Sequence, residues 1–246
     1  MTDPASLAII AVAFVAGGFL KGFAGLGLPL VTVTVLNFVF GLPAAVALMT
    51  VSGLATNAYQ AFGGPHLREG FLRIWPFIAA CCLFVWFGTG ILVSVDQRLL
   101  VIALGLLLAV SAALAILGWS PSLSRPTQRW LGPLVGALNG LCCGITGITS
   151  VPSVIYVRAL GMPREMMIQA MGALFGLSYI AIVAALVVRG TYEMEVGLVS
   201  ALAVPPAFAG MWLGRRLRLR TDPARFTTLF NWTLLAIGSA IVVRAI

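Results

Sequence analysis

One basic residue inside an apolar segment is the feature of this sequence that most directly suggests ligand chemistry. Lys21 lies within the apolar run 5–40, whereas the seven acidic residues all lie at predicted helix ends or in loops. A buried ammonium is costly unless an opposite charge compensates it, so an anionic ligand could supply that charge. The alternative is that Lys21 extends its amine to an aqueous interface from a short helix.

Two glycine-rich turns offer groups that suit the same kind of ligand. One turn follows Lys21, and the other lies in the apolar run 130–157. Backbone amides at the start of a helix bind anions, and the helix dipole helps them. Two such turns could form one site near the middle of a membrane, whereas glycines at every fourth position could equally serve close helix packing. The candidate substrate-binding residues of the turns are Lys21, Gly22, Gly25, Gly27, Asn139, Gly140, Gly144, Thr146, Gly147, Thr149 and Ser150.

Polar residues in the apolar runs that follow each turn are further candidates for a binding site. Asn57 and Tyr59 lie in the first of these runs, and Gln169 and Tyr179 lie in its counterpart about 120 residues later. Polar groups in lipid-buried helices normally face the interior of the bundle, where they could contact a substrate. Hydrogen bonding between helices is the alternative explanation for each residue.

Several kinds of chemistry are excluded by the residues that the chain lacks. The only histidine, His66, lies in a predicted loop, and a serine hydrolase needs a base beside its nucleophile, so we expect no enzyme and no catalytic residue. The four cysteines form two adjacent pairs in apolar runs, which indicates neither a disulfide framework nor a metal site. We therefore expect no cofactor.

The composition places the chain in a membrane. Apolar residues make up 61% of its 246 residues and charged residues only 9%, far below the roughly one quarter found in soluble domains. The 15 basic residues give a net charge of +8, but they occur singly or in one short cluster between apolar runs, which excludes a nucleic-acid partner. The lipid bilayer is the expected partner, and the apolar runs are 5–40, 44–63, 72–93, 98–118, 130–157, 165–188, 196–214 and 226–245.

Two of these runs are too long for a single crossing, which needs about 20 residues. The runs 5–40 and 130–157 both contain clustered glycines and a proline, which break helices. We predict that each forms two short helices joined by an irregular turn at membrane depth. The other six runs each predict one transmembrane helix.

The sequence repeats itself, with a first half at residues 1–118, a linker at 119–129 and a second half at 130–246. If each broken segment crossed the membrane once, eight basic residues would lie on the cytoplasmic side and six outside. If each entered and returned on its own side, the numbers would be eleven and three, which fits the positive-inside rule better. The expected fold is an all-α polytopic membrane protein. Its two related halves, each a re-entrant helix pair plus three transmembrane helices, are expected to be inverted repeats.

The two glycine-rich segments resemble the motifs of the sulfite exporter TauE/SafE family of membrane permeases. The first reads Gly18-Phe-Leu-Lys-Gly-Phe-Ala-Gly-Leu-Gly-Leu-Pro29, and its second copy reads Gly136-Ala-Leu-Asn-Gly-Leu-Cys-Cys-Gly-Ile-Thr-Gly147. The resemblance covers essentially the whole chain. It implies movement of small anions, such as sulfite and organosulfonates, across the cytoplasmic membrane.

The leading hypothesis is a multi-pass transporter of the cell inner membrane that moves a small anion by alternating access. An anion channel of similar build is one alternative, and a non-transporting scaffold subunit that uses its glycines only for packing is another. Because no acidic residue is predicted in the membrane, the coupling ion could be a proton carried by the substrate or a sodium ion. A homo-oligomer is left open.

Overall fold

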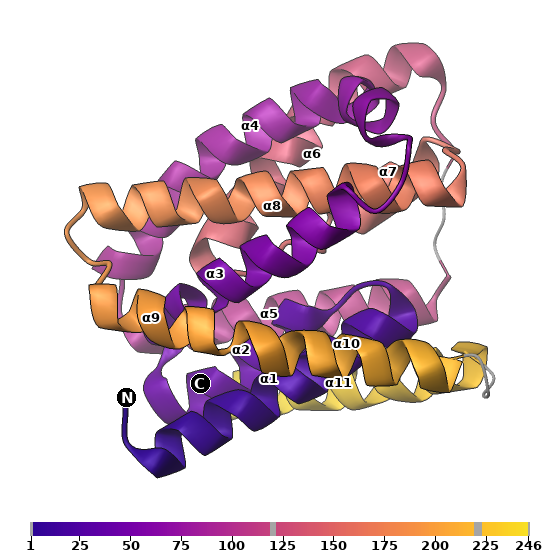
Figure 1. Ribbon diagram of the computed structural model, residues 1–246. Coiled ribbons are helices and arrows are strands. Elements are labelled where there is room, and N and C mark those ends of the chain that lie inside the picture. Colours follow the sequence, from indigo (N-terminus) through magenta and orange to yellow (C-terminus); the bar gives the residue numbers. More distant parts are fainter. Residues whose placement is uncertain (1, 119–121, 219–222, 246) are drawn as a thin grey trace. The chain divides into compact units, whose positions relative to one another are not determined.

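The computed structural model describes residues 2–118, 122–218 and 223–245, and all regular secondary structure in these residues is helical. The helices are shown in Figure 1. In chain order they are α1 (Pro4–Ala24), α2 (Leu28–Phe40), α3 (Leu42–Ala61), α4 (Leu67–Ser94), α5 (Gln97–Ile116), α6 (Arg125–Thr146), α7 (Ser153–Ala159), α8 (Arg164–Val188), α9 (Met194–Leu202), α10 (Val204–Arg218) and α11 (Pro223–Ala245).

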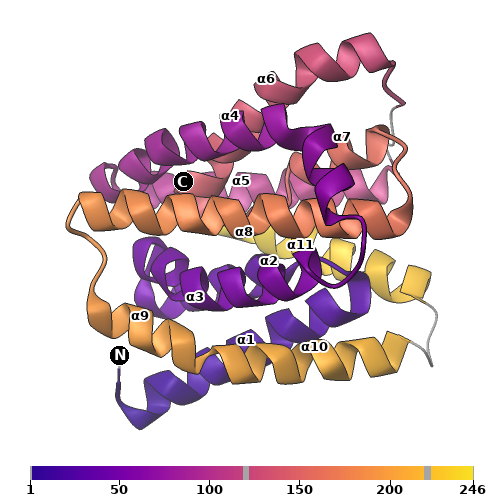
Figure 2. The ribbon, with the colours of Figure 1, turned by 45° about the horizontal axis from the view of Figure 1, so that its top comes forward.

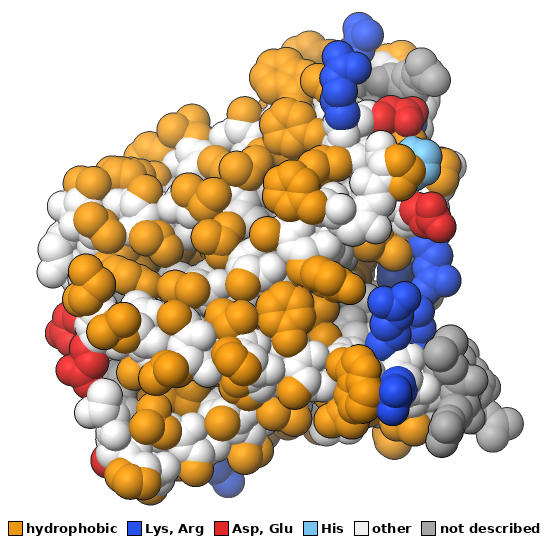
Figure 3. Space-filling view, in the orientation of Figure 1, with side chains coloured by type: hydrophobic (Ala, Val, Ile, Leu, Met, Phe, Trp, Pro, Cys, Tyr) orange, Lys and Arg blue, Asp and Glu red, His pale blue; other side chains and the backbone are white. Residues whose placement is uncertain are grey.

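Helix length and hydropathy make this a multi-pass membrane protein. In the described part of the chain, six helices are long and apolar enough to cross a membrane, namely α1, α3, α4, α5, α8 and the continuous pair α9–α10. On the face seen in Figure 3, hydrophobic side chains cover the helices, and charged side chains gather near helix ends. This distribution is the one expected of helices whose outer surfaces contact lipid.

The first long apolar run folds into a helical hairpin. Gly25 and Gly27 have φ angles of 85° and 105°, a conformation that glycine adopts without a steric penalty. The Gly25 amide caps α1 by donating to the Lys21 carbonyl at 2.8 Å. Thr32 on α2 then donates to the Ala13 carbonyl on α1 at 3.2 Å. Residues 19 apart in one continuous helix would be separated by about 28 Å, so α2 must turn back along α1.

The second long run forms a hairpin in the same way. Gly147 has a φ of 69°, and its amide caps α6 by donating to the Cys143 carbonyl at 2.7 Å. Tyr156 on α7 donates to the Gln128 carbonyl near the start of α6 at 2.9 Å, although 28 residues separate the two. The broken segments are therefore confirmed as helix pairs, not single kinked helices.

One detail of the predicted layout is wrong. The first helix of each pair is not short, because α1 has 21 residues and α6 has 22, which gives each a length of about 32 Å. The helix α6 begins at Arg125, within the predicted linker 119–129, of which residues 119–121 lie outside the described part. Proline near the start of each helix explains both boundaries, because Pro4 and Pro126 occupy first-turn positions where no amide is needed.

The predicted span 196–214 is divided into α9 and α10 at Ala203. Pro205 and Pro206 lie in the first turn of α10. A proline has no amide hydrogen to donate, and its ring crowds the carbonyl four residues earlier. The amides of Ala203 and Ala207 still donate to carbonyls four residues earlier, both at 3.1 Å. The interruption is thus local, and the chain continues as one apolar span.

The chain forms two compact units, of which the first consists of Met1–Ser52, Ser94–Trp119 and Glu193–Ile246. In this unit α1 packs closely on α10 (Figure 2). A Cβ at Gly18 or Gly22 would collide with the backbone of α10, and one at Gly210 or Gly214 would collide with the backbone of α1. Gly105 and Gly238 allow a similar approach of α5 and α11.

The second unit consists of Gly53–Val93 and Ser120–Tyr192. Here α6 packs on α4, because Gly136, Gly140 and Gly144 lie against the backbone of α4. Each unit therefore pairs the hairpin of one sequence half with a helix of the other half. The repeat halves 1–118 and 130–246 do not coincide with the compact units.

Candidate functional site

The candidate residues fall into two groups, one in each compact unit. Lys21, Gly22, Gly25 and Gly27 belong to the first unit. The second unit holds the remaining candidates, which are Asn57, Tyr59, Asn139, Gly140, Gly144, Thr146, Gly147, Thr149, Ser150, Gln169 and Tyr179. A single site formed by both turns would need residues from both units, and it stays a prediction.

Lys21 lies in the last turn of α1 and is only 5% exposed. Among the described acidic and basic residues it is the only one that is buried. Its position is four residues before Gly25, where α1 ends and the chain becomes non-helical. A cationic side chain is thus held inside the protein beside a helix break, which is where transporters of broken-helix design place their ligands.

The helix α2 begins shortly after Lys21 in the sequence. The amide groups of its first turn point away from the body of the helix. Gly27 is the N-cap residue, and no described side chain caps the helix. Leu28 and Pro29, the first two residues of α2, are both buried. The first amides of a helix lack partners within it and carry the positive end of the dipole, which favours a negatively charged ligand.

The second hairpin is fastened by Asn139, the repeat counterpart of Lys21. Asn139 is fully buried. Its side-chain oxygen accepts from the Ser153 amide at 3.0 Å, and its amide nitrogen donates to the Cys81 sulfur at 3.4 Å. Asn139 therefore links α6 to the start of α7 and to α4. This arrangement ties together the two arms of the hairpin around the turn.

The hydroxyls around the second turn differ in how they are used. Thr146 donates to the Cys142 carbonyl at 2.7 Å and accepts from the Ile148 amide at 3.2 Å. The Thr149 carbonyl accepts from the Ser153 hydroxyl at 2.6 Å. The Ser150 hydroxyl, by contrast, is buried and has no hydrogen-bond partner among the described residues. An unsatisfied buried hydroxyl costs stability unless a ligand or water meets it.

Two tyrosines that are 120 residues apart in sequence have opposite environments. Tyr179 is buried and donates to the Gly147 carbonyl at 3.0 Å, so it holds the turn against α8. Tyr59 is 58% exposed. The expectation that polar residues of these helices face the interior is therefore wrong for Tyr59. It is right for Asn57 and Gln169, which are both buried.

Gln169 has an unsatisfied buried atom like that of Ser150. Its side-chain oxygen is buried and has no hydrogen-bond partner in the described part of the chain. Its amide nitrogen lies close to Gly64, where an added Cβ would collide with it. Gln169 on α8 therefore has an acceptor that remains available to a donor.

The structure shows which neighbouring helices the glycines near the turns pack against. Gly22, Gly140 and Gly144 lie inside helices, where backbone amides donate to the carbonyl four residues earlier. The backbones of neighbouring helices lie close to all three glycines, which supports the packing interpretation. A role of these glycines in substrate binding stays a prediction. Gly25 and Gly147 instead end helices, and their amides serve as caps.

Sequence reasoning missed Ser153 and Cys81, two residues that help to fasten the second hairpin. Ser153 bonds both Asn139 and Thr149, as described above. The Cys81 sulfur lies 3.5 Å from the Ser178 hydroxyl, and Ser178 also donates to the Leu174 carbonyl at 2.8 Å. A serine directly after Pro152 could have signalled a helix start. Nothing local to Cys81 or Ser178 could have signalled their contact, because 97 residues separate them.

These features define a class: a polytopic helical membrane protein with two broken, hairpin-forming segments. The family model for the sulfite exporter TauE/SafE family matches residues 9–241. The chain belongs to this family, and membership implies a membrane exporter of sulfite or a related anion. No curated protein and no solved structure matches the chain in the corresponding comparisons.

Proposed function

We propose that this protein is a secondary transporter of the cell inner membrane that exports a small sulfur-containing oxyanion, such as sulfite or an organosulfonate, by alternating access. Family membership supports the anion class. The two hairpins support a transporter, because broken helices recur where transporters bind their substrates.

The observation that carries the proposal is the burial of Lys21 beside the start of α2. An ammonium in a membrane-buried position is expensive to maintain, so it marks a functional site by default. The positive end of the α2 dipole adds to the same local potential. Both features favour a negatively charged substrate over a neutral or cationic one.

The second hairpin contributes neutral groups suited to an oxyanion. The Ser150 hydroxyl can donate one hydrogen bond, and it has no partner among the described residues. We propose that it donates to a substrate oxygen during the transport cycle. Neutral donors bind an oxyanion without adding charge, which allows the substrate to leave again.

Coupling by a buried carboxylate is not part of this proposal. The six described acidic residues, Asp3, Glu69, Asp96, Glu165, Glu193 and Glu195, are all exposed. We propose instead that coupling uses either protonation of the substrate or a sodium ion. Proteoliposomes with imposed proton or sodium gradients separate the two, because only the gradient that is used will drive accumulation.

A ligand screen followed by a flux assay tests the proposal. Purified protein is first heated with sulfite, sulfonates, sulfate, thiosulfate and small carboxylates, and a bound ligand raises the melting temperature by mass action. The best ligand is then used in proteoliposomes. A flux that saturates with concentration supports a transporter, and a flux that rises linearly supports the channel.

Lys21→Met is the decisive variant, with Arg158→Met as its control. Arg158 is an exposed basic residue at the end of α7, so its replacement removes a charge without touching the proposed site. We expect Lys21→Met to lose ligand-induced stabilisation and flux and Arg158→Met to keep both. A Lys21→Met protein that carries the anion at the normal rate overturns the proposed site. Absence of both ligand-induced stabilisation and flux in the unaltered protein would instead favour the scaffold function.

A further inference from the structure

A second basic site lies in the second unit. A cavity of about 750 Å³ is formed between the start of α4, the start of α6, and α7. Its lining includes Arg73, Gln128, Arg129, Trp130 and Tyr156 and contains no acidic residue among those described. None of the candidate substrate-binding residues lines it.

The helix lengths place the two arginines at the level of the lipid headgroups. The 28 residues of α4 span about 42 Å, which exceeds the roughly 30 Å hydrocarbon core. From Arg73 to the end of α4 at Ser94 the helix rises about 32 Å. From Arg129 to the end of α6 at Thr146 it rises about 26 Å. Both arginines therefore lie near one edge of the core.

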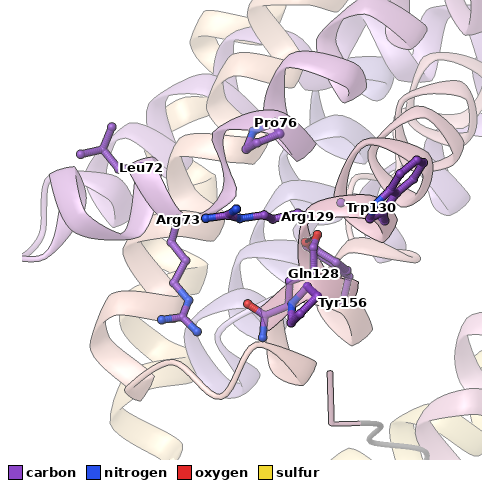
Figure 4. A pocket seen from close by; sticks show the side chains of 9 residues that line it. Leu72, Arg73, Pro76, Gln128, Arg129, Trp130 and Tyr156 are labelled. Carbon is purple, nitrogen blue, oxygen red and sulfur yellow. Dashed lines mark hydrogen bonds between the residues drawn. The ribbon is translucent and has the colours of Figure 1, made fainter. Parts of the chain in front are cut away.

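The arginines retain hydrogen-bonding capacity for a ligand. Arg73 donates from one terminal nitrogen to the Leu160 carbonyl at 3.0 Å, which uses one of the five donors of a guanidinium. Arg129 makes no hydrogen bond or ion pair with the described residues. Figure 4 shows its side chain extending from α6 toward α4, where Arg73 lies. Planar guanidinium groups bind phosphate oxygens in pairs, which a lysine cannot do.

Tyr156 joins the helices that form one wall of the cavity. The Tyr156 hydroxyl donates to the Gln128 carbonyl at 2.9 Å, and its ring stacks on Phe77 with centroids 5.0 Å apart. Tyr156 thereby joins α7 to both α6 and α4. A ligand in the cavity would thus contact a wall whose three helices are joined by these interactions.

The rim of the cavity is apolar and faces outward. Trp130 is 79% exposed and Leu72 is 55% exposed. Exposed tryptophan at a span end is typical of the membrane interface. The volume lies within the range of about 300–1,000 Å³ that encloses a drug-sized ligand. Such a space is far larger than sulfite needs, but it suits a glycerol-phosphate group whose acyl chains continue along the rim.

We infer that this cavity binds the headgroup of an anionic phospholipid. Arg73 and Arg129 contact the phosphodiester, and Leu72 and Trp130 contact the first part of the acyl chains. In the topology that the positive-inside rule favours, both arginines lie on the cytoplasmic side. Basic pockets between transmembrane helices on that side suit anionic headgroups.

The test compares lipid binding by two charge-matched double variants of the full-length protein in detergent. Arg73→Gln/Arg129→Gln changes the cavity, and Arg158→Gln/Arg164→Gln removes the same charge from exposed positions of the same unit that do not line it. Binding of phosphatidylglycerol is measured by native mass spectrometry and by the rise in melting temperature, with phosphatidylcholine as the uncharged comparison. We expect about a 5-fold loss of phosphatidylglycerol affinity per cavity arginine, hence about 25-fold for the cavity variant, and little loss for the control.

Two results would overturn the inference. Equal affinity in both double variants would show that the cavity does not hold the headgroup. An equal thermal gain from inorganic phosphate or glycerol 3-phosphate would show that the ligand is a small free anion and not a lipid. If loss of the Arg73 hydrogen bond prevents folding, Arg129→Gln alone serves as the test, with an expected loss of about 5-fold; unchanged affinity in that variant also overturns the inference.

Discussion

The α1–α2 and α6–α7 hairpins have the same backbone plan but differ in what fastens them. The first is closed by the small residue Gly17 against α2 and by the hydrogen bond from Thr32 to Ala13. The second is linked by side chains, through Asn139 to Ser153 and through Tyr156 to Gln128.

The repeat-related positions 21 and 139 show what this difference means. Lys21 places a basic side chain inside the first hairpin. Asn139 instead uses its hydrogen-bonding groups to join the two arms of the second hairpin and to contact α4. One copy of the repeat therefore buries a basic side chain at this position, and the other uses the same position as a structural link. Substitutions in the two hairpins can test whether they differ in this way.

The largest effect is expected where the second hairpin meets α4. Gly140→Ala places a Cβ against the Cys81 backbone, and overpacking of this kind costs about 1–3 kcal/mol, with rigid backbone favouring the upper end. Gly176→Ala on α8 is the control, because its Cβ would meet only ordinary contacts at 3.9 Å. Thermal unfolding in detergent should show a clearly lower melting temperature for Gly140→Ala and an unchanged melting temperature for Gly176→Ala. Equal melting temperatures would contradict the packing role of Gly140.

The next prediction contrasts the two repeat-related positions directly. Asn139→Leu leaves the buried Ser153 amide without its acceptor, which costs about 1–3 kcal/mol. Lys21→Met removes a buried cation and should leave the unfolding temperature unchanged or higher, because an ammonium in a membrane interior is costly. Unfolding in detergent without ligand measures both. The proposed difference between the hairpins fails if Lys21→Met is destabilised as much as Asn139→Leu.

A smaller effect is expected from the tyrosine pair. Tyr179→Phe removes the hydrogen bond to the Gly147 carbonyl and should lower the free energy of unfolding by about 0.5–1.5 kcal/mol. Tyr59→Phe alters an exposed residue and should change it by less than about 0.5 kcal/mol. The same unfolding assay serves for both, and a larger loss in Tyr59→Phe would show that exposure is a poor guide at these positions.

The smallest stability effect separates two neighbouring serines. Ser153→Ala loses a donor to the Thr149 carbonyl and should cost about 1 kcal/mol. Ser150→Ala removes a hydroxyl that has no partner among the described residues and should be neutral or slightly stabilising. In the flux assay, however, Ser150→Ala should raise the substrate concentration needed for half-maximal rate. Unaltered transport in this variant would remove Ser150 from the proposed site.

Local patterns in the sequence were sufficient to predict the class of protein and the position of the turn in each of the two hairpins. Hydropathy over about 20 residues identifies a membrane helix without knowledge of its neighbours. Glycine at the end of a helical run marks a cap, as Gly25 and Gly147 show. The repeated motif was sufficient for the family, which the match over residues 9–241 confirms.

The pairing of helices could not be read from the sequence, because it depends on contacts between distant residues. A glycine at every fourth position permits close approach, but it does not name the helix that approaches. The structure assigns α10 to α1 and α4 to α6, and each pair joins elements from different sequence halves. It also buries Tyr179 while exposing Tyr59, although both lie in apolar runs. Such differences arise because the burial of a helical residue depends on which face its neighbours cover, and that face is set by long-range packing.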